Sequence, residues 1–182
     1  MKTVIVFLAD GFEECEGLLV VDLLRRAGLN VVTASVMGRR EITSSHNVTL
    51  LADTLAEEAD FAGADLIVLP GGMPGTLRLG ESPIVAEQCR AFAADRAVAA
   101  ICAAPSVLAG LGLLEGRRAT CYPTFADKLA GARVTGEAVT VDGNLITGQG
   151  LGAAIPFALT LIRTLVDGET ADRVAQAICW RG

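Results

Sequence analysis

Short apolar runs alternate with amphipathic segments along almost the whole chain, and this alternation constrains the fold more than any other feature. The apolar runs have the length and composition of buried strands, and they cover residues 3–8, 30–35, 66–69 and 98–101. The clearest helical pattern between them covers residues 13–27 and ends at Gly28, a favourable C-terminal residue. Strands and helices that alternate in this way form a mostly parallel sheet covered on both faces. We therefore predict a single α/β domain over residues 1–182.

The remaining segments extend this pattern. Ser82 is the expected N-cap of a helix that begins at Pro83 and ends at about residue 95. Further helices are expected at 103–109, 123–129, 153–166 and 169–178, and a short strand at 119–121. Two hairpins are expected, the first from 41–43 and 48–51, the second from 138–141 and 144–147. The Asp142-Gly143 pair inside the second is the strongest turn signal in the chain.

Composition narrows the class of protein. Of 182 residues, 52% are hydrophobic and 20% are charged, and the formal net charge is −6. No Lys/Arg cluster interrupts this acidic balance, so we expect no nucleic-acid partner. No apolar run reaches membrane-spanning length, and the first run is too short for a signal peptide. These features predict a cytoplasmic protein without a membrane partner.

The cysteines and the single histidine limit the possible cofactors. Five cysteines are present without any C-x-x-C pair. An odd number without this spacing argues against a disulfide framework or a zinc site and favours a reducing compartment. His46 is the only histidine, which excludes most metal sites. We expect neither a bound metal nor a cofactor.

Cys102 lies where the apolar run 98–101 ends and a helix begins. Pro105 suits a first helical turn, because no N–H is needed there. The free N–H groups and positive dipole end of that helix favour the thiolate over the thiol. The small Ala103 and Ala104 allow the tight strand-to-helix turn that presents a nucleophile. Cysteine is also a common core residue, so position alone leaves function and packing equally open.

Glu16 lies on the same helical stripe as Leu19, Val20 and Leu23. A carboxylate on a buried face costs free energy unless it is paired or protonated, and burial raises its pKa. Such a group can donate a hydrogen bond or act as a general acid or base at neutral pH. A carboxylate that merely complements the helix dipole is the alternative interpretation. Because Cys102 follows a strand in the same predicted sheet, we favour the functional interpretation of Glu16.

Pro70-Gly71-Gly72 directly follows the strand predicted at 66–69, so it reaches the same edge of the sheet as Cys102. Glycines at this point can simply serve a turn. Alternatively, the missing side chains open backbone N–H groups to an oxyanion, and the N–H groups of Gly72 and Ala103 would then face Cys102. The glycine-rich stretch 148–152 lacks the P-loop lysine and the dinucleotide pattern, so we interpret it as a close-packed turn before a helix.

Several motifs occur together and in order: DGFEECE at 10–16, DLLRRAG at 22–28, LPGG at 69–72 and AAICAAP at 99–105. They resemble the ThiJ/PfpI superfamily over nearly the whole chain, specifically the DJ-one branch, named after a parkinsonism-associated deglycase-like protein. The resemblance implies a flavodoxin-like three-layer α/β/α sandwich and a homodimer. It also implies that Cys102, on a nucleophile elbow, is an oxidation-prone nucleophile hydrogen-bonded to a protonated Glu16, in a pocket lined by Gly71, Gly72 and Ala103.

Two positions depart from the family pattern. Where the parkinsonism-associated protein has a histidine beside the cysteine, this chain has Tyr122, so the usual imidazole base is missing. Where the family often has an arginine from the dimer partner, this chain has His46. His46 is therefore a candidate to enter the partner's crevice, where it would make the charge of the pocket pH-dependent. An exposed loop histidine is the equally supported alternative.

The resemblance implies cofactor-free conversion of methylglyoxal to lactate, or repair of early glycation adducts, with Cys102 as nucleophile and Glu16 as proton carrier. A small dicarbonyl or a glycated molecule is then the substrate. A second hypothesis is a redox sensor or chaperone-like protective protein, switched by oxidation of Cys102 with little or no turnover. A protease or glutamine amidotransferase is a third, but it needs a Cys–His pair that His46, placed early in the chain, does not provide.

Overall fold

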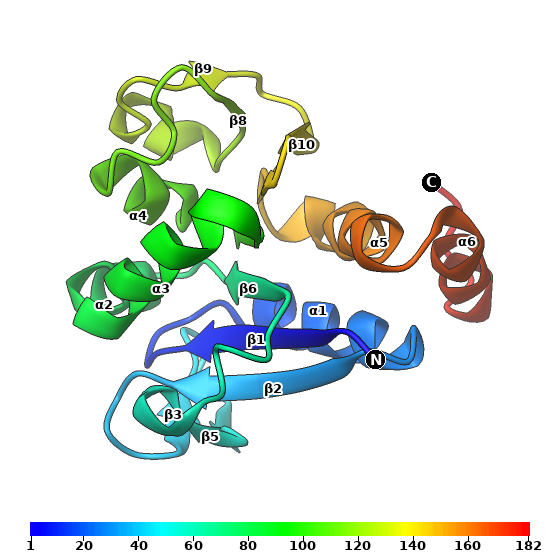
Figure 1. The fold of residues 1–182 in the computed structure, drawn as a ribbon, viewed down its shortest axis with the longest axis horizontal. Helices are drawn as coiled ribbons and strands as arrows, with labels where there is room; N and C mark the ends of the chain where they lie inside the picture. Colours follow the sequence, from blue (N-terminus) through cyan, green and yellow to red (C-terminus); the bar gives the residue numbers. More distant parts are fainter.

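A computed structural model describes residues 1–182, which form a seven-stranded sheet with the order β10-β11-β7-β6-β1-β2-β5 (Figure 1). Its strands are β1 (Thr3–Leu8), β2 (Asn30–Ser35), β5 (Thr54–Leu55), β6 (Leu66–Leu69), β7 (Ala97–Ile101), β10 (Val139–Asp142) and β11 (Leu145–Gly148). All neighbouring strands pair in parallel except β10 and β11, which are antiparallel. The carboxyl ends of β1, β6 and β7 therefore lie at one edge, which is where Cys102 and Gly71 follow their strands.

Two small sheets lie outside this one. An antiparallel pair joins β3 (Glu41–Thr43) to β4 (Thr49–Leu51), and a parallel pair joins β8 (Arg118–Ala119) to β9 (Arg133–Val134). The first pair confirms the predicted early hairpin, and β10 with β11 confirms the second.

Helices cover both faces of the large sheet because successive strand residues point to opposite sides. One face packs against α1 (Glu14–Arg26), α5 (Ala154–Leu165) and α6 (Gly168–Ala177). The other packs against α2 (Gly75–Glu81), α3 (Pro83–Asp95) and α4 (Pro105–Gly110). Along β1, Val4 and Val6 belong to the first core, whereas Ile5 and Phe7 belong to the second. The structure confirms the predicted three-layer α/β/α architecture.

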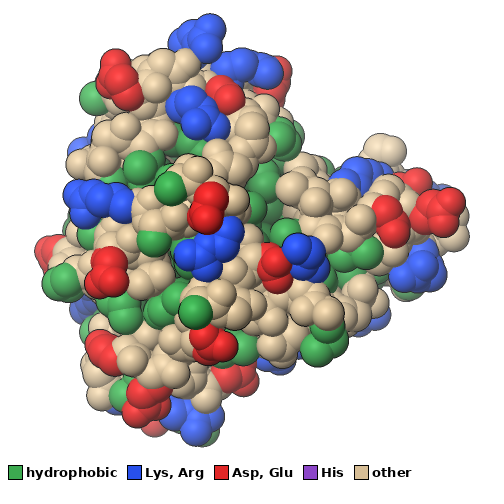
Figure 2. Space-filling view, viewed as in Figure 1, with side chains coloured by type: hydrophobic (Ala, Val, Ile, Leu, Met, Phe, Trp, Pro, Cys, Tyr) green, Lys and Arg blue, Asp and Glu red, His purple; other side chains and the backbone are tan.

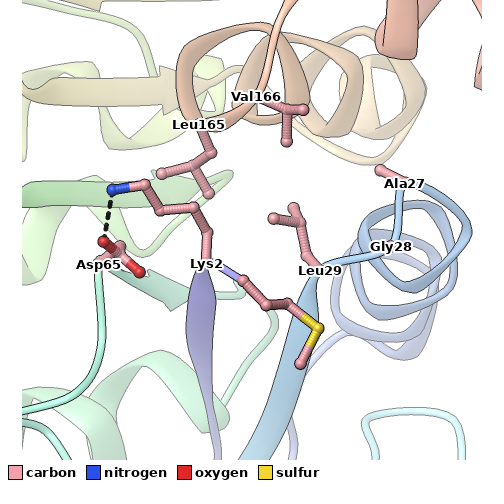
Figure 3. A pocket seen from close by; sticks show the side chains of 8 residues that line it. Lys2, Ala27, Gly28, Leu29, Asp65, Leu165 and Val166 are labelled. Carbon is pink, nitrogen blue, oxygen red and sulfur yellow. Dashed lines mark hydrogen bonds and ion pairs between the residues drawn. The ribbon is translucent and has the colours of Figure 1, made fainter.

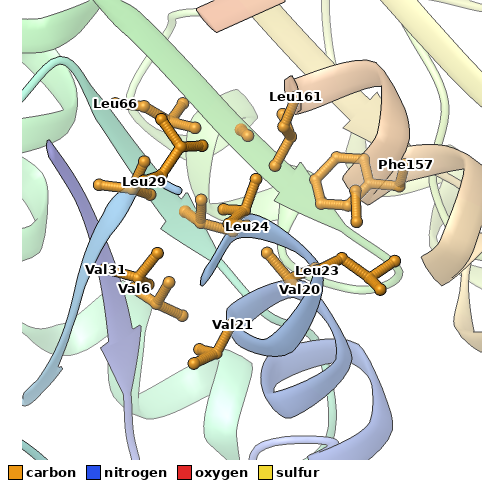
Figure 4. Close-up of a cluster of buried hydrophobic side chains, with 14 of the residues drawn as sticks. Val6, Val20, Val21, Leu23, Leu24, Leu29, Val31, Leu66, Phe157 and Leu161 are labelled. Carbon is orange, nitrogen blue, oxygen red and sulfur yellow. The ribbon is translucent and has the colours of Figure 1, made fainter. Parts of the chain in front are cut away.

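The core on the α1 face fixes the helix that carries Glu16. Val20, Leu23 and Leu24 of α1 pack toward Phe157 and Leu161 of α5 over the sheet (Figure 4). Burying such side chains stabilises a fold by about 1.5–3 kcal/mol each. Glu16 shares the buried face of α1 with these residues, so the packing of the helix dictates where its carboxyl lies.

Several local expectations were incomplete or wrong. Residues 123–129 were predicted as a helix, but Pro123–Lys128 forms a 3-10 helix (η2). Ser82 precedes α3 as expected, yet its side chain makes no cap hydrogen bond. The short elements α2, β5 and β9 were not predicted, because two to seven residues are too few to show a period. Two further 3-10 turns occur, η1 (Ala56–Glu58) and η3 (Leu151–Ala153).

Two features relate to the predicted absence of membrane and nucleic-acid partners: the character of the helices and the distribution of charge on the surface. None of the helices combines the length and the apolar character that crossing a bilayer would require. On the face shown in Figure 2, acidic and basic side chains are interspersed and form no large patch of one sign.

Candidate active site

Cys102 has a backbone conformation that few non-glycine residues adopt. Its φ is 64°, in the left-handed region. The strained turn is held on both sides, because its N–H donates to the carbonyl of Gly148 at 2.9 Å and its carbonyl accepts from the N–H of Tyr122 at 2.8 Å. Strained backbone of this kind marks functional sites and the nucleophile elbow. The predicted elbow at Cys102 has the expected geometry.

Gly71 and Gly72 approach the site so closely that a side chain has no room. A Cβ on Gly71 would lie 2.5 Å from Oε2 of Glu16 and 2.6 Å from Cβ of Cys102. Gly72 has a φ of +91°, and its Cβ would overlap the backbone of Phe12 and Glu13. The glycines therefore do more than form a turn. They bring the loop after β6 against both Glu16 and Cys102.

Glu16 is buried, with 1% of its surface exposed. Its Oε2 accepts a hydrogen bond from the N–H of Gly71 at 3.0 Å, whereas Oε1 is buried without a hydrogen-bond partner. The pKa of Glu16 is raised from 4.5 to about 7, chiefly by burial and also by the nearby Glu13 charge. The Cys102 thiol and the Gly71 N–H act in the opposite direction. The predicted buried carboxyl with a raised pKa is present.

Cys102 departs from the sequence expectation in its ionisation. The pKa of its thiol is raised to about 12, chiefly by burial and also by the charge and hydrogen bonding of Glu16. The N–H groups of Ala103 and Gly72 face the sulfur and lower the pKa, but they do not outweigh burial. The expected preference for thiolate was wrong for Cys102 beside an ionised Glu16. The helix that follows, α4, has only six residues, and its dipole competes with a buried carboxylate.

The two groups titrate as a coupled pair. Because two negative charges in one buried site repel each other, the pair loses its first proton near neutral pH and its second only at strongly alkaline pH. Once Glu16 has ionised, the site holds one proton, on the sulfur of Cys102, and one negative charge, on the carboxylate.

Replacing Glu16 with glutamine is expected to stabilise the protein above neutral pH. A pKa raised from 4.5 to about 7 corresponds to about 3 kcal/mol of destabilisation once the group is ionised. Below the unfolded-state pKa both side chains are neutral, so the two proteins should be equally stable. The advantage of Glu16→Gln should grow as the pH rises from about 4.5 to about 7 and then level off. Urea unfolding at several pH values measures this, and a pH-independent difference would contradict the raised pKa.

The other two predicted site residues lie at the surface. Tyr122 is 47% exposed, and its ring lies over Gly150, while its N–H binds the carbonyl of Cys102. The His46 side chain is 70% exposed, and its Nδ1 lies 2.9 Å from Oε1 of Glu14 in the same chain. Within one chain, His46 is thus paired at the start of α1. Its predicted entry into a partner's crevice stays a prediction.

None of the five surface pockets includes Cys102 or Glu16. Tyr122 lines a shallow pocket of about 400 Å³ with Gly150 and Leu151. A pocket of about 500 Å³ lies at the opposite, amino ends of the strands, beside the Lys2–Asp65 ion pair (Figure 3). The glycine loop reaches Cys102 as predicted, but no pocket of the single chain includes the cysteine.

Glu13 was missed as a site residue by the sequence reasoning. Its side chain caps α1 by accepting from the N–H of Glu16 at 2.7 Å. The available signal was its place directly before the helix, where a carboxylate can accept from an unpaired N–H. Glutamate is not among the favoured N-caps, so the signal was weak.

A comparison of the chain with models of protein families gives a result that fits this site of an elbow cysteine, a buried glutamate and a glycine loop. The family model described as the DJ-1/PfpI family matches residues 2–164. The chain belongs to the DJ-1/PfpI family. The family predicted from the motifs is therefore confirmed.

Relatives cover the chain along its length. Drosophila melanogaster dj-1beta is 38% identical over 180 residues, which are 97% of this chain and 96% of that protein. Arabidopsis thaliana DJ-1 homolog A is 39% identical over 184 residues, but the match covers 99% of this chain and only 47% of that protein. The chain thus spans about half the length of that relative. The Caenorhabditis elegans protein named glutathione-independent glyoxalase DJR-1.2 is 29% identical over 170 residues, 92% of this chain and 90% of that protein.

Solved structures give the same family. The structure of oxidized Toxoplasma gondii DJ-1 superimposes with a TM-score of 0.96 at 35% identity, covering 100% of both chains. This match confirms the flavodoxin-like fold that the motifs implied.

Proposed function

We propose that this protein is a cysteine-dependent, cofactor-free enzyme of the glyoxalase or deglycase type, acting on methylglyoxal or on early glycation adducts. The observation that carries the proposal is the surroundings of Cys102. Its sulfur faces the N–H groups of Gly72 and Ala103, and the carboxyl of Glu16 lies beside it. This combination supplies a nucleophile, an oxyanion site and a proton carrier. The relative named as a glyoxalase supports the same class.

The reaction begins when the sulfur of Cys102 adds to the aldehyde carbon of methylglyoxal, and protonation of the new alkoxide gives a hemithioacetal. Glu16 then removes the proton from this carbon and returns one to the neighbouring carbonyl carbon, while the N–H groups of Gly72 and Ala103 hold the developing oxyanion. The hydroxyl proton on the first carbon passes to the oxygen of the second, which restores a carbonyl on the first carbon. The product on Cys102 is a lactoyl thioester, which water hydrolyses to lactate and the free thiol. One carbon is oxidised while its neighbour is reduced, so no external oxidant or cofactor is required.

The missing histidine base is replaced in this proposal by Glu16 itself. The reactive form arises when the thiol of Cys102 transfers its proton to the ionised carboxyl of Glu16, which leaves the negative charge on the sulfur. Two N–H groups face the sulfur, whereas the carboxyl receives only the Gly71 N–H. Oε1 makes no hydrogen bond in the single chain, so it is free to hold this proton. Because Glu16 supplies the proton carrier, Tyr122 is not needed as a base.

We further propose that a second copy of the chain completes the substrate site in a cytoplasmic homodimer, without nucleic-acid or membrane partners. Cys102 is half-buried and belongs to no pocket of the single chain, so a small aldehyde would remain open to water there. His46, on the exposed turn beside α1, is the candidate side chain from the partner. Sedimentation equilibrium tests the dimer, and substitution of His46 by asparagine tests the contribution of the imidazole to KM.

The proposed activity is tested by measuring lactate formed from excess methylglyoxal by the purified chain. Product must be measured, because cysteine and arginine side chains of any protein consume methylglyoxal stoichiometrically. We expect many equivalents of lactate per chain. Formation of less than one equivalent would reject the enzymatic proposal.

A redox role for the same cysteine is favoured by one specific observation. The unpartnered Oε1 of Glu16, when protonated, would donate to a sulfinate oxygen on Cys102. Two equivalents of hydrogen peroxide convert the thiol to the sulfinic acid and release two waters. The solved relative in oxidized form is compatible with this chemistry.

At low peroxide we expect Cys102 to gain two oxygen atoms before any other cysteine does. Cys15 and Cys179 are exposed, but neither lies in an oxyanion site. Mass spectrometry of the intact chain and its peptides measures the order of oxidation. Prior loss of Cys15 or Cys179 would remove the basis for the redox role.

A further inference from the structure

Glu13 connects the two halves of the proposed site through a closed ring of hydrogen bonds. Its backbone N–H donates to the carbonyl of Gly71 at 2.9 Å. The N–H of Gly71 donates to Oε2 of Glu16 at 3.0 Å, and the N–H of Glu16 donates to Oε2 of Glu13 at 2.7 Å. The ring joins the start of α1 to the loop after β6. Glu13 is 9% exposed, so water competes little for these bonds.

We infer that Glu13 is a positioning residue: it holds the Glu16 carboxyl and the Gly71-Gly72 loop against Cys102 and places a negative charge beside their shared proton. The inference rests on the proposed function, and it adds a residue that touches neither the sulfur nor the substrate. The backbone N–H of Glu13 contacts the glycine loop whatever its side chain, so the side chain acts through its bond to the N–H of Glu16 and through its charge.

The electrostatic effect of Glu13 on Glu16 follows from their like charges and from burial. The Glu13 charge raises the pKa of Glu16, because like charges in a buried site disfavour ionisation. The titratable groups around these two carboxyls are Cys102 at the end of β7, Cys15 and Glu14 on α1, and His46 on the turn before β4. Nδ1 of His46 lies 3.9 Å from Oε1 of Glu13.

Glu14 provides a matched control for Glu13. It has the same charge and is the next residue, but its carboxylate interacts with Ser45 and with His46 at 2.9 Å. It has no bond to Gly71 or Glu16. An effect specific to the ring should therefore appear in Glu13 variants and not in Glu14 variants.

The test measures the rate at which iodoacetamide alkylates Cys102 from about pH 5 to about pH 10, with the modified peptide quantified by mass spectrometry. Cys15→Ser and Cys179→Ser are included so that the exposed thiols do not consume reagent. We expect Glu13→Gln to move the first midpoint of the rate profile to lower pH, because the amide still accepts from Glu16 but carries no charge. Glu14→Gln should leave that midpoint in place. Repeating the comparison with His46→Asn removes the imidazole titration from the profile.

Comparison of Glu13→Ala with Glu13→Gln separates the contribution of the hydrogen bond to Glu16 from the contribution of the negative charge. It removes both the charge and the acceptor, so we expect the same midpoint shift together with a lactate-forming rate about five- to tenfold lower. If Glu13→Ala does not fold, Glu13→Gln still provides the test. A Glu13→Gln midpoint that coincides with the parent, or an equal shift in Glu14→Gln, would overturn the inference. Alkylation does not depend on turnover, so absence of lactate in the parent would reject the proposed function without deciding the role of Glu13.

Discussion

Replacing Cys102 with serine is expected to lower the rate of lactate formation by at least about 10³-fold. The serine hydroxyl fits the same space, but it is a far weaker nucleophile than a thiolate and the site has no imidazole to activate it. The N–H groups of Gly72 and Ala103 and the carboxyl of Glu16 would remain in place. The loss should therefore appear in kcat, which is measured as lactate formed per chain at saturating methylglyoxal.

Cys15→Ser is the matched control for this experiment. It makes the same chemical change next to Glu16, on an exposed side chain that faces no oxyanion site. We expect it to retain the parental rate. Undiminished turnover in Cys102→Ser would contradict the proposed mechanism. If Cys102→Ser, Cys15→Ser and the parent all formed negligible lactate, the redox role would be favoured.

Replacing Gly72 with alanine is expected to destabilise the fold by at least about 3 kcal/mol. Two effects combine at this position. The φ of +91° disfavours any side chain, and the new Cβ would overlap backbone atoms of Phe12 and Glu13. Backbone cannot rotate away as a flexible side chain can, so the β6–α2 loop would have to move from the start of α1. Urea unfolding measures the change in the free energy of unfolding.

Gly28 separates backbone strain from steric overlap. Its φ of +81° is similar, but an added Cβ would meet nothing within 4 Å. Gly28→Ala should therefore cost about 1–2 kcal/mol, the strain of the left-handed conformation alone. If Gly72→Ala costs no more than Gly28→Ala, the close approach of the glycine loop to Phe12 and Glu13 would be wrong.

The sequence predicted the parts of this protein that depend on local pattern. Runs such as 66–69 and 98–101 identified buried strands, because a parallel sheet covered on both faces requires continuous apolar segments. The stripe on α1 identified Glu16 as buried, because a helix brings residues three and four apart onto one face. Cys102 followed a strand and preceded Pro105, which was enough to predict the elbow. Elements too short to show a period, such as α2 and β5, escaped this reasoning.

The tertiary structure alone decided how these parts act on one another. Gly71 and Glu16 are 55 residues apart in the chain, and only the packing of α1 against the sheet brings the carboxyl to the glycine loop and the sulfur. The ionisation of Cys102 was wrongly predicted for the same reason: a local pattern indicates a helix dipole, but the pKa depends on burial and on a carboxylate from another element. The sequence by itself determined that Cys102, Glu16 and the glycine loop form the site, and at which edge of the sheet they lie, but it did not identify Glu13. Their shared proton, and the ring through Glu13 that surrounds it, exist only once distant segments meet in a buried place where water no longer screens their charges.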